Sequence, residues 1–125
     1  MVRLQPSAIM VVGDDPSFVY LMQRYARESA YRVMTSHPHE DVLAIIRREQ
    51  PVAIVLELDT PTAAAQRLLK RLRSNPDTSA IPAIVCTWTE DKDLAIESDT
   101  AAVCLHKPVL YADFLSALSL LGVDH

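Results

Sequence analysis

Residues 52–58, Val-Ala-Ile-Val-Leu-Glu-Leu, are apolar at every position except Glu57. A run of this length in Val, Ile and Leu is typical of a β-strand. Because apolar side chains fall on both faces of that strand, we expect both faces to be covered, as in a parallel sheet flanked by helices. Further strands are predicted at residues 8–12, 31–36, 81–87 and 101–105.

Helices are predicted in the segments between these strands and after the last one. After residues 8–12, Asp15 is a natural N-cap and Pro16 suits the first helical position. Apolar residues then recur at helical spacing. The predicted helices cover residues 16–29, 40–49, 62–74, 91–97 and 111–121. Strands that alternate with helices in this way predict an α/β fold with a doubly wound, five-stranded parallel sheet.

The composition is that of one folded domain. The chain has 125 residues, of which 50% are apolar and 22% charged, so we expect a single domain over residues 1–125. This length excludes enzymes that need separate cofactor and substrate domains. The net charge of -4 argues against nucleic acid or an anionic membrane as the main partner. No apolar run approaches the ~18 to 20 residues that cross a bilayer, and residues 1–5 lack signal-peptide features, so we expect a cytoplasmic protein.

Polar side chains stand at the carboxyl ends of four predicted strands. These ends meet at one edge of a doubly wound sheet, which is where such sheets bind ligands. Carboxylates there can hold Mg²⁺, and a Lys with a Thr hydroxyl can bind a phosphoryl group. For Asp15 taken alone, a helix cap is the better explanation. The residues at this edge are Asp14, Asp15, Glu57, Asp59, Thr87 and Lys107.

Four motifs at these strand ends, in residues 11–16, 51–61, 77–87 and 105–108, resemble the receiver domain of two-component response regulators. The resemblance covers essentially the whole chain. It implies a flavodoxin-like (βα)5 sheet with strand order 2-1-3-4-5, and a role in signal transduction and phosphorelay. It also implies that a histidine kinase donates a phosphoryl group to an Asp after the third strand, that an acidic pair binds Mg²⁺, and that the Thr and Lys bind the phosphoryl oxygens.

The acceptor position departs from the family pattern. The family's acceptor lies four residues before a Pro, and counting back from Pro61 reaches Glu57. The extra methylene of Glu moves the carboxylate by about an ångström or more, which costs about 10²-fold in rate. Glu57 is then either a built-in partial mimic of the phosphorylated aspartate, the interpretation we favour slightly, or drift at a position that no longer matters.

Three further departures from the family point the same way. Gly13 replaces the first acid of the metal-binding pair, while Asp14 matches the retained ligand and Asp15 the less constrained acid beside it. We therefore expect no cofactor, or weakly bound Mg²⁺. Trp88 stands where the family has a small residue, so its indole either covers the pocket or lies on the surface. Cys104 occupies the place of the family's switch aromatic.

The leading hypothesis is a stand-alone pseudo-receiver, not an enzyme and without catalytic residues. Lys107 then serves as the structural partner of Glu57, because a buried charge without a partner is costly. The expected partner is a protein, either a histidine kinase or a downstream signalling protein, and no output module is expected after Gly122. The first alternative is a receiver phosphorylated at Asp59. The second is a small aspartate-based phosphatase, because residues 57–60 are similar to its acid-x-acid-x-Thr strand end.

Other features predict surfaces and ordinary structure. Both cysteines, Cys86 and Cys104, lack metal-ligand spacing and are interpreted as buried, reduced thiols. A homodimer is expected to use residues 91–97, 101–105 and 111–121, with an exposed apolar patch. That patch comprises Val103, Leu110 and Tyr111. We interpret the segment with His37, His39 and Glu40 as a surface loop in preference to a zinc site. A solvated helix face able to dock an acidic partner is predicted at Arg67, Lys70 and Arg71.

Overall fold

The computed structural model describes residues 7–38, 40–59, 64–88 and 102–123. Its centre is a five-stranded sheet in the order β2-β1-β3-β4-β5, in which all neighbouring strands are parallel. The predicted fold class and strand order are confirmed. The strands are β1 Ala8–Val12, β2 Arg32–Ser36, β3 Ala53–Glu57, β4 Ala83–Thr87 and β5 Ala102–His106.

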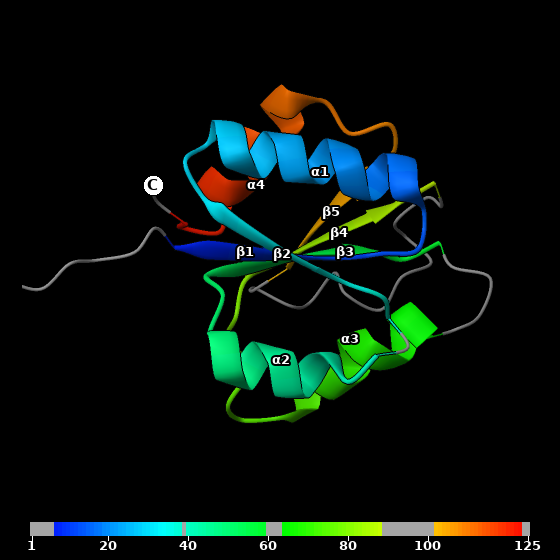
Figure 1. Ribbon diagram of the computed structural model, residues 1–125, viewed down its shortest axis with the longest axis vertical. Coiled ribbons are helices and arrows are strands. Elements are labelled where there is room, and N and C mark those ends of the chain that lie inside the picture. The colour runs from blue at the N-terminus through cyan, green and yellow to red at the C-terminus, as the bar shows by residue number, and fades with distance from the viewer. Residues whose placement is uncertain (1–6, 39, 60–63, 89–101, 124–125) are drawn as a thin grey trace, which may run out of the picture.

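Two of the described helices cover each face of the sheet (Figure 1). The helices α1 (Pro16–Glu28) and α4 (Tyr111–Leu120) lie on one face, and α2 (Val42–Glu49) and α3 (Ala64–Ser74) lie on the other. The helix predicted at residues 91–97 falls outside the described residues. No helix in the described part of the chain has the length and apolar character needed to cross a membrane.

Capping side chains place the starts of α1 and α2. Asp15 is the N-cap of α1, and its side chain accepts a hydrogen bond from the Ser17 N–H at 3.0 Å. Asp41 caps α2 by accepting from the Ala44 N–H at 3.3 Å. The helix predicted from residue 40 therefore starts at Val42, because a cap residue itself lies outside the helix.

The core consists of two apolar layers, one on each face of the sheet. Alternate residues of β1 belong to opposite layers, with Ile9 packed beneath α1 and α4 and Met10 beneath α2 and α3. All five residues of β3 are buried, as its two-sided apolar pattern predicts. The sheet thus separates the two apolar layers. The polar side chains lie at the carboxyl ends of its strands.

The predicted exposed apolar patch is wrong for two of its three residues. Leu110 is 61% exposed. Val103 and Tyr111 are instead partly buried and pack against the core layer under α1 and α4. The described part of this surface therefore offers one exposed side chain of that set, and the predicted homodimer gains no support from it.

Candidate functional site at the carboxyl edge of the sheet

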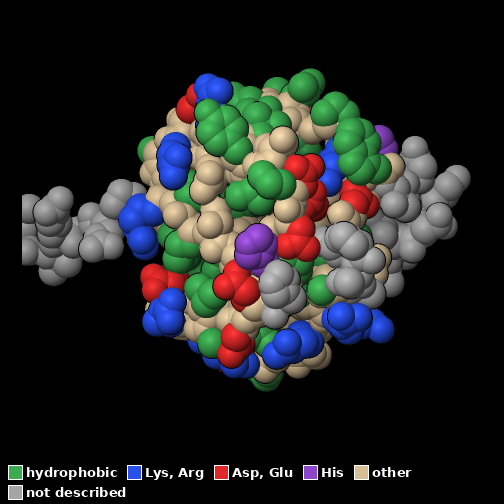
Figure 2. Space-filling model, turned by 45° about the vertical axis from the view of Figure 1, so that its right-hand side comes forward, with side chains coloured by type: hydrophobic (Ala, Val, Ile, Leu, Met, Phe, Trp, Pro, Cys, Tyr) green, Lys and Arg blue, Asp and Glu red, His purple; other side chains and the backbone are tan. Residues whose placement is uncertain are grey.

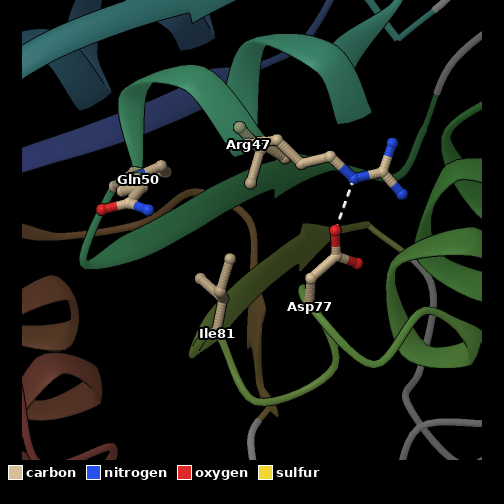
Figure 3. A pocket seen from close by; sticks show the side chains of 6 residues that line it. Arg47, Gln50, Asp77 and Ile81 are labelled. Carbon is tan, nitrogen blue, oxygen red and sulfur yellow. Dashed lines mark hydrogen bonds and ion pairs between the residues drawn. The ribbon is translucent and has the colours of Figure 1, made fainter.

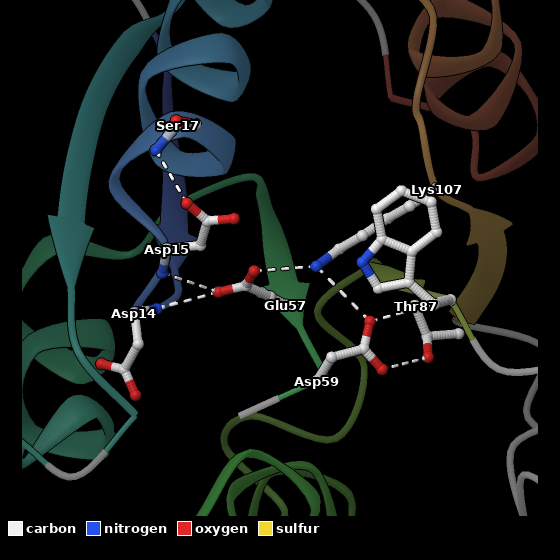
Figure 4. A network of polar contacts seen from close by, with 8 residues as sticks. Asp14, Asp15, Ser17, Glu57, Asp59, Thr87 and Lys107 are labelled. Atoms are coloured by element: carbon white, nitrogen blue, oxygen red, sulfur yellow. Dashed lines mark hydrogen bonds and ion pairs between the residues drawn. The ribbon is translucent and has the colours of Figure 1, made fainter. Parts of the chain in front are cut away.

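Glu57 ends β3 and is the centre of a buried polar network (Figure 4). It is 1% exposed. Its Oε1 accepts hydrogen bonds from the backbone N–H groups of Asp14 at 2.9 Å and Asp15 at 3.1 Å. Its Oε2 accepts one from Lys107 Nζ at 2.8 Å. One carboxylate thereby joins the chain after β1, the end of β3 and the chain after β5, with the lysine that we expected as its partner.

Gly13 leaves the space that the longer Glu57 side chain occupies. A Cβ atom at position 13 would lie 2.8 Å from Glu57 Oε1, closer than real Cβ atoms approach other heavy atoms, and 3.1 Å from Glu57 Cβ. A side chain at position 13 would therefore press on the Glu57 side chain, which would have to shift to make room. Nothing in the sequence spacing of Gly13 and Glu57 signals this contact.

The side chains of the two acids that follow Gly13 contact groups other than Glu57. The Asp15 side chain caps α1. Asp14 Oδ1 lies 2.9 Å from His37 Nδ1, and its side chain points away from Glu57 in Figure 4. Among the described residues, no group of three or more His, Cys, Asp or Glu side chains is placed to hold a metal ion.

The loop after β2 is a surface loop, as predicted for its described part. The His37 side chain is 57% exposed. Glu40 Oε1 accepts hydrogen bonds from the His37 N–H at 2.7 Å and from Ser36 Oγ at 3.1 Å. His39 lies outside the described residues. The fold also brings Asp14 to His37, a contact that the sequence spacing did not predict.

Asp59 is a second carboxylate at the edge, two residues beyond Glu57. Its Oδ1 accepts a hydrogen bond from Thr87 Oγ1 at 2.6 Å, and its Oδ2 accepts one from the Trp88 N–H at 2.7 Å. Lys107 Nζ lies 3.4 Å from the same Oδ2. The Thr and Lys that the resemblance assigns to phosphoryl oxygens thus contact the Asp59 carboxylate, which is 26% exposed.

Trp88 flanks Lys107. The residue is 59% exposed, and its ring centroid lies 5.9 Å from Lys107 Nζ. The indole meets the His106 ring edge-on, with centroids 6.3 Å apart. Phe18 lies closer to the lysine, with Lys107 Nζ 4.8 Å from its ring centroid. The indole therefore lies at the surface with one face toward the buried Lys107 ammonium.

Neither of the two cysteines forms a disulfide, and they differ in burial. Cys86 lies within β4 and is buried, whereas Cys104 in β5 is only partly buried, so the expectation of burial is wrong for Cys104. Burial raises the pKa of the Cys86 thiol well above its usual range. Cys86 is therefore a protonated core residue at neutral pH.

Charged side chains of both signs lie on the face shown in Figure 2. Several Asp and Glu side chains lie near the middle of the view, and Lys and Arg side chains lie along the lower margin, on the side of α2 and α3, and also at the left and upper left. Arg67, Lys70 and Arg71 are exposed on α3, as predicted. This helix contains no acidic residue between Ala64 and Ser74.

The fold and the edge together define a receiver-like α/β protein. A family model of the response regulator receiver domain matches residues 9–119. The chain belongs to this family. Receiver domains act in two-component signalling with protein partners such as histidine kinases, and they are generally non-enzymatic signalling modules.

Relatives share sequence over much of the chain. An uncharacterized 14.6 kDa protein of Leptolyngbya boryana is 30% identical over 102 residues, which are 78% of this chain and 77% of that protein. Protein PilH of Pseudomonas aeruginosa is 26% identical over 85 residues, which are 68% of this chain and 69% of PilH.

Solved structures share the fold. The chemotaxis protein CheY4 of Vibrio cholerae has a TM-score of 0.80 at 18% identity, and the match covers 94% of this chain and 99% of that chain. The receiver domain of a DNA-binding response regulator from Colwellia psychrerythraea has a TM-score of 0.78 at 18% identity, covering 93% and 98%. At these identities the likeness shows the fold alone.

Proposed function

We propose that this protein is a pseudo-receiver, which signals through protein–protein contact without phosphorylation of an aspartate. The observation that carries the proposal is the state of the Glu57 carboxylate. It stands at the acceptor position, is 1% exposed, and has one oxygen bound by two backbone N–H groups and the other by Lys107. A nucleophile needs access to the phosphodonor, and burial and the three hydrogen bonds restrict that access for this carboxylate.

The metal-binding acids of the family also have no equivalent arrangement here. Gly13 supplies no ligand, and Asp14 is in contact with His37. The charge of Glu57 is already compensated by the Lys107 ammonium at 2.8 Å. Mg²⁺ prefers several oxygen ligands in near-ideal octahedral geometry. This donor set does not fit it, and the proposed function requires no metal.

A protein is the proposed partner, either a histidine kinase or a downstream signalling protein. The exposed basic residues of α3 form a surface with no acid in the same helix, which suits an acidic segment of such a partner. The -4 net charge of the chain makes nucleic acid a poor second candidate. A homodimer stays a prediction for sedimentation analysis.

The test is incubation with Mg²⁺ and acetyl phosphate, and separately with beryllofluoride. We expect no stoichiometric, acid-stable but hydroxylamine-labile adduct by intact mass, and no chemical-shift change at Thr87 or Lys107. The double variant Gly13→Asp/Glu57→Asp is the matched comparison, and we expect it to regain Mg²⁺ binding more readily than phosphorylation. A stoichiometric adduct on the unmodified protein would overturn the proposal.

A receiver phosphorylated at Asp59 is the second candidate. The observation that favours it is accessibility, because the Asp59 side chain is 26% exposed while that of Glu57 is 2% exposed. If the protein does form an adduct, loss of that adduct in Asp59→Asn would establish this version. The phosphatase alternative predicts turnover of an aryl phosphate, and we expect none.

A further inference from the structure

Two hydrogen-bond donors and one cation converge on the Asp59 carboxylate. They are the Thr87 hydroxyl at 2.6 Å, the Trp88 backbone N–H at 2.7 Å and the Lys107 ammonium, which forms an ion pair at 3.4 Å. The hydroxyl and the ammonium are the groups that the receiver family places on phosphoryl oxygens, and such a set suits an oxyanion. We propose that in this chain Asp59 occupies that oxyanion position as a resident ligand, a carboxylate tethered by the chain itself.

The Trp88 amide shows why the site needs an occupant. The ladder of β4 ends at Thr87, whose carbonyl accepts the Lys107 N–H at 2.9 Å. The next amide, that of Trp88, lies beyond the ladder and donates to Asp59 Oδ2. Without this carboxylate the amide and the Thr87 hydroxyl would both lose this acceptor, and the exposed amide would turn to solvent or to another anion.

The charge balance closes the occupied site to free anions. Lys107 faces two carboxylates, Glu57 at 2.8 Å and Asp59 at 3.4 Å, so the site carries one more negative than positive charge. A third anion would meet this net negative charge, and the Thr87 hydroxyl and the Trp88 amide already donate to Asp59. When the Asp59 carboxylate is removed, the donors regain room for an oxyanion of the phosphate or sulfate class, bound weakly because Glu57 still neutralises Lys107.

This inference rests on the proposed function and deepens it. In a receiver that is not phosphorylated, a tethered carboxylate keeps the ends of β3, β4 and β5 joined in one arrangement. The state of the edge is then determined by the sequence of the chain and not by an exchangeable anion. Asp59 acts here as a positioning residue for Thr87, Trp88 and Lys107.

The experiment compares the protein with its Asp59→Ala variant during titration with orthophosphate or sulfate, at constant ionic strength. Trp88 is the only tryptophan, so its fluorescence and its backbone amide resonance both report on the site. We expect a saturable response in Asp59→Ala and an affinity at least about tenfold lower in the unmodified protein. Without added anion, exchange of the Trp88 amide hydrogen should be at least about tenfold faster in Asp59→Ala.

Two controls separate this site from general electrostatics. Glu28→Gln removes one negative charge from an exposed pair with Arg24 and should leave anion binding unchanged. Adding Thr87→Val to Asp59→Ala removes one donor and should abolish the saturable response. Equal anion binding by the unmodified protein, or a Trp88 amide whose exchange is unaffected by Asp59→Ala, would overturn the inference. Adduct formation at Glu57 with these results intact would instead overturn the proposed function alone.

Discussion

At position 13, a side chain and the Glu57 carboxylate compete for the same space. The Glu57 carboxylate has little freedom to move aside, because three donors hold it. We predict that Gly13→Ala destabilises the protein by about 1–3 kcal/mol, the usual cost of overpacking. In a Glu57→Asp background the carboxylate retracts by one methylene, and the cost of Gly13→Ala should fall.

Urea denaturation of the four proteins of this cycle measures the coupling, which should be about 0.5–3 kcal/mol. Gly13→Ala in an Asp77→Asn background is the control, because Asp77 lies on the exposed loop after α3 and should give additive costs. Additivity in the Glu57→Asp cycle as well would contradict the assigned contact.

The two cysteines should differ in reactivity. Burial raises the pKa of the Cys86 thiol, so its nucleophilic thiolate is scarce in the folded protein. We predict that iodoacetamide alkylates Cys104 first and Cys86 only when urea unfolds the chain. The Cys104→Ser variant reports Cys86 alone. Equal alkylation rates in the folded state would refute the assignment.

The raised pKa of Cys86 also predicts a pH dependence of stability. Because the pKa of the Cys86 thiol in the folded protein lies above the ordinary value of 9.0, stability should fall as the pH rises above about 9, where the unfolded chain releases the thiol proton.

At the scale of elements, Arg47 joins α2 to the loop after α3 (Figure 3). Its Nε donates to Asp77 Oδ2 at 2.6 Å and its Nη2 to Asn75 Oδ1 at 3.1 Å, beside an open cavity of about 390 Å³. The hydrogen bond from Arg47 lowers the pKa of the Asp77 carboxyl from its ordinary value of 3.8.

This pair predicts a pH-dependent stability difference. A lowered folded pKa means that the stabilisation is present above pH 3.8 and is lost as the pH falls through the folded pKa. Asp77→Asn should therefore unfold at lower urea concentration at pH 7, and the difference should shrink as the pH approaches 3. The effect should be small and salt-sensitive because the pair is exposed. Glu49→Gln is the matched control, and an Asp77→Asn difference that persists unchanged at low pH would refute the pairing.

Element positions were predictable where local chemistry marks them. The bounds of β1 agree with its apolar run, which Gly13 and Asp14 end. The strand predicted from residue 81 begins instead at Ala83, because Pro82 has no N–H to donate to the ladder. Local signals locate an element to within a few residues, and capping and pairing groups then decide its first residue.

The sequence predicts contacts between oppositely charged side chains of the site, but not the contacts made by backbone groups. The Glu57–Lys107 pair follows from charge and strand order. The contact of Gly13 with Glu57 and the hydrogen bond from the Trp88 amide to Asp59 depend on the path of the chain beyond the strands. Side-chain identity says nothing of that path, so the sequence predicts Asp59 as a carboxylate at the strand ends and a candidate phosphate acceptor, but not as the partner of the Trp88 amide.

At the scale of the whole molecule, the sheet separates two apolar layers. Ile9 lies in the layer under α1 and α4, whereas Ile46 and Leu72 lie in the layer under α2 and α3. Ile→Val substitutions cost about 0.5–1.5 kcal/mol and Leu→Ala about 2–5 kcal/mol in such cores. Residues in different layers share no side-chain neighbours across the backbone of the sheet, so their costs should be independent.

We therefore predict that Ile9→Val and Leu72→Ala are additive within about 0.5 kcal/mol in urea denaturation. Ile46→Val with Leu72→Ala should depart from additivity by more than that, because the cavity left by Leu72 lies in the layer that holds Ile46 and lets it repack. If Ile9→Val lost its cost in the Leu72→Ala background, the layers would be coupled through the sheet. The buried Glu57–Lys107 pair, which ties the ends of β3 and β5, would then be the first candidate for the group that transmits the coupling.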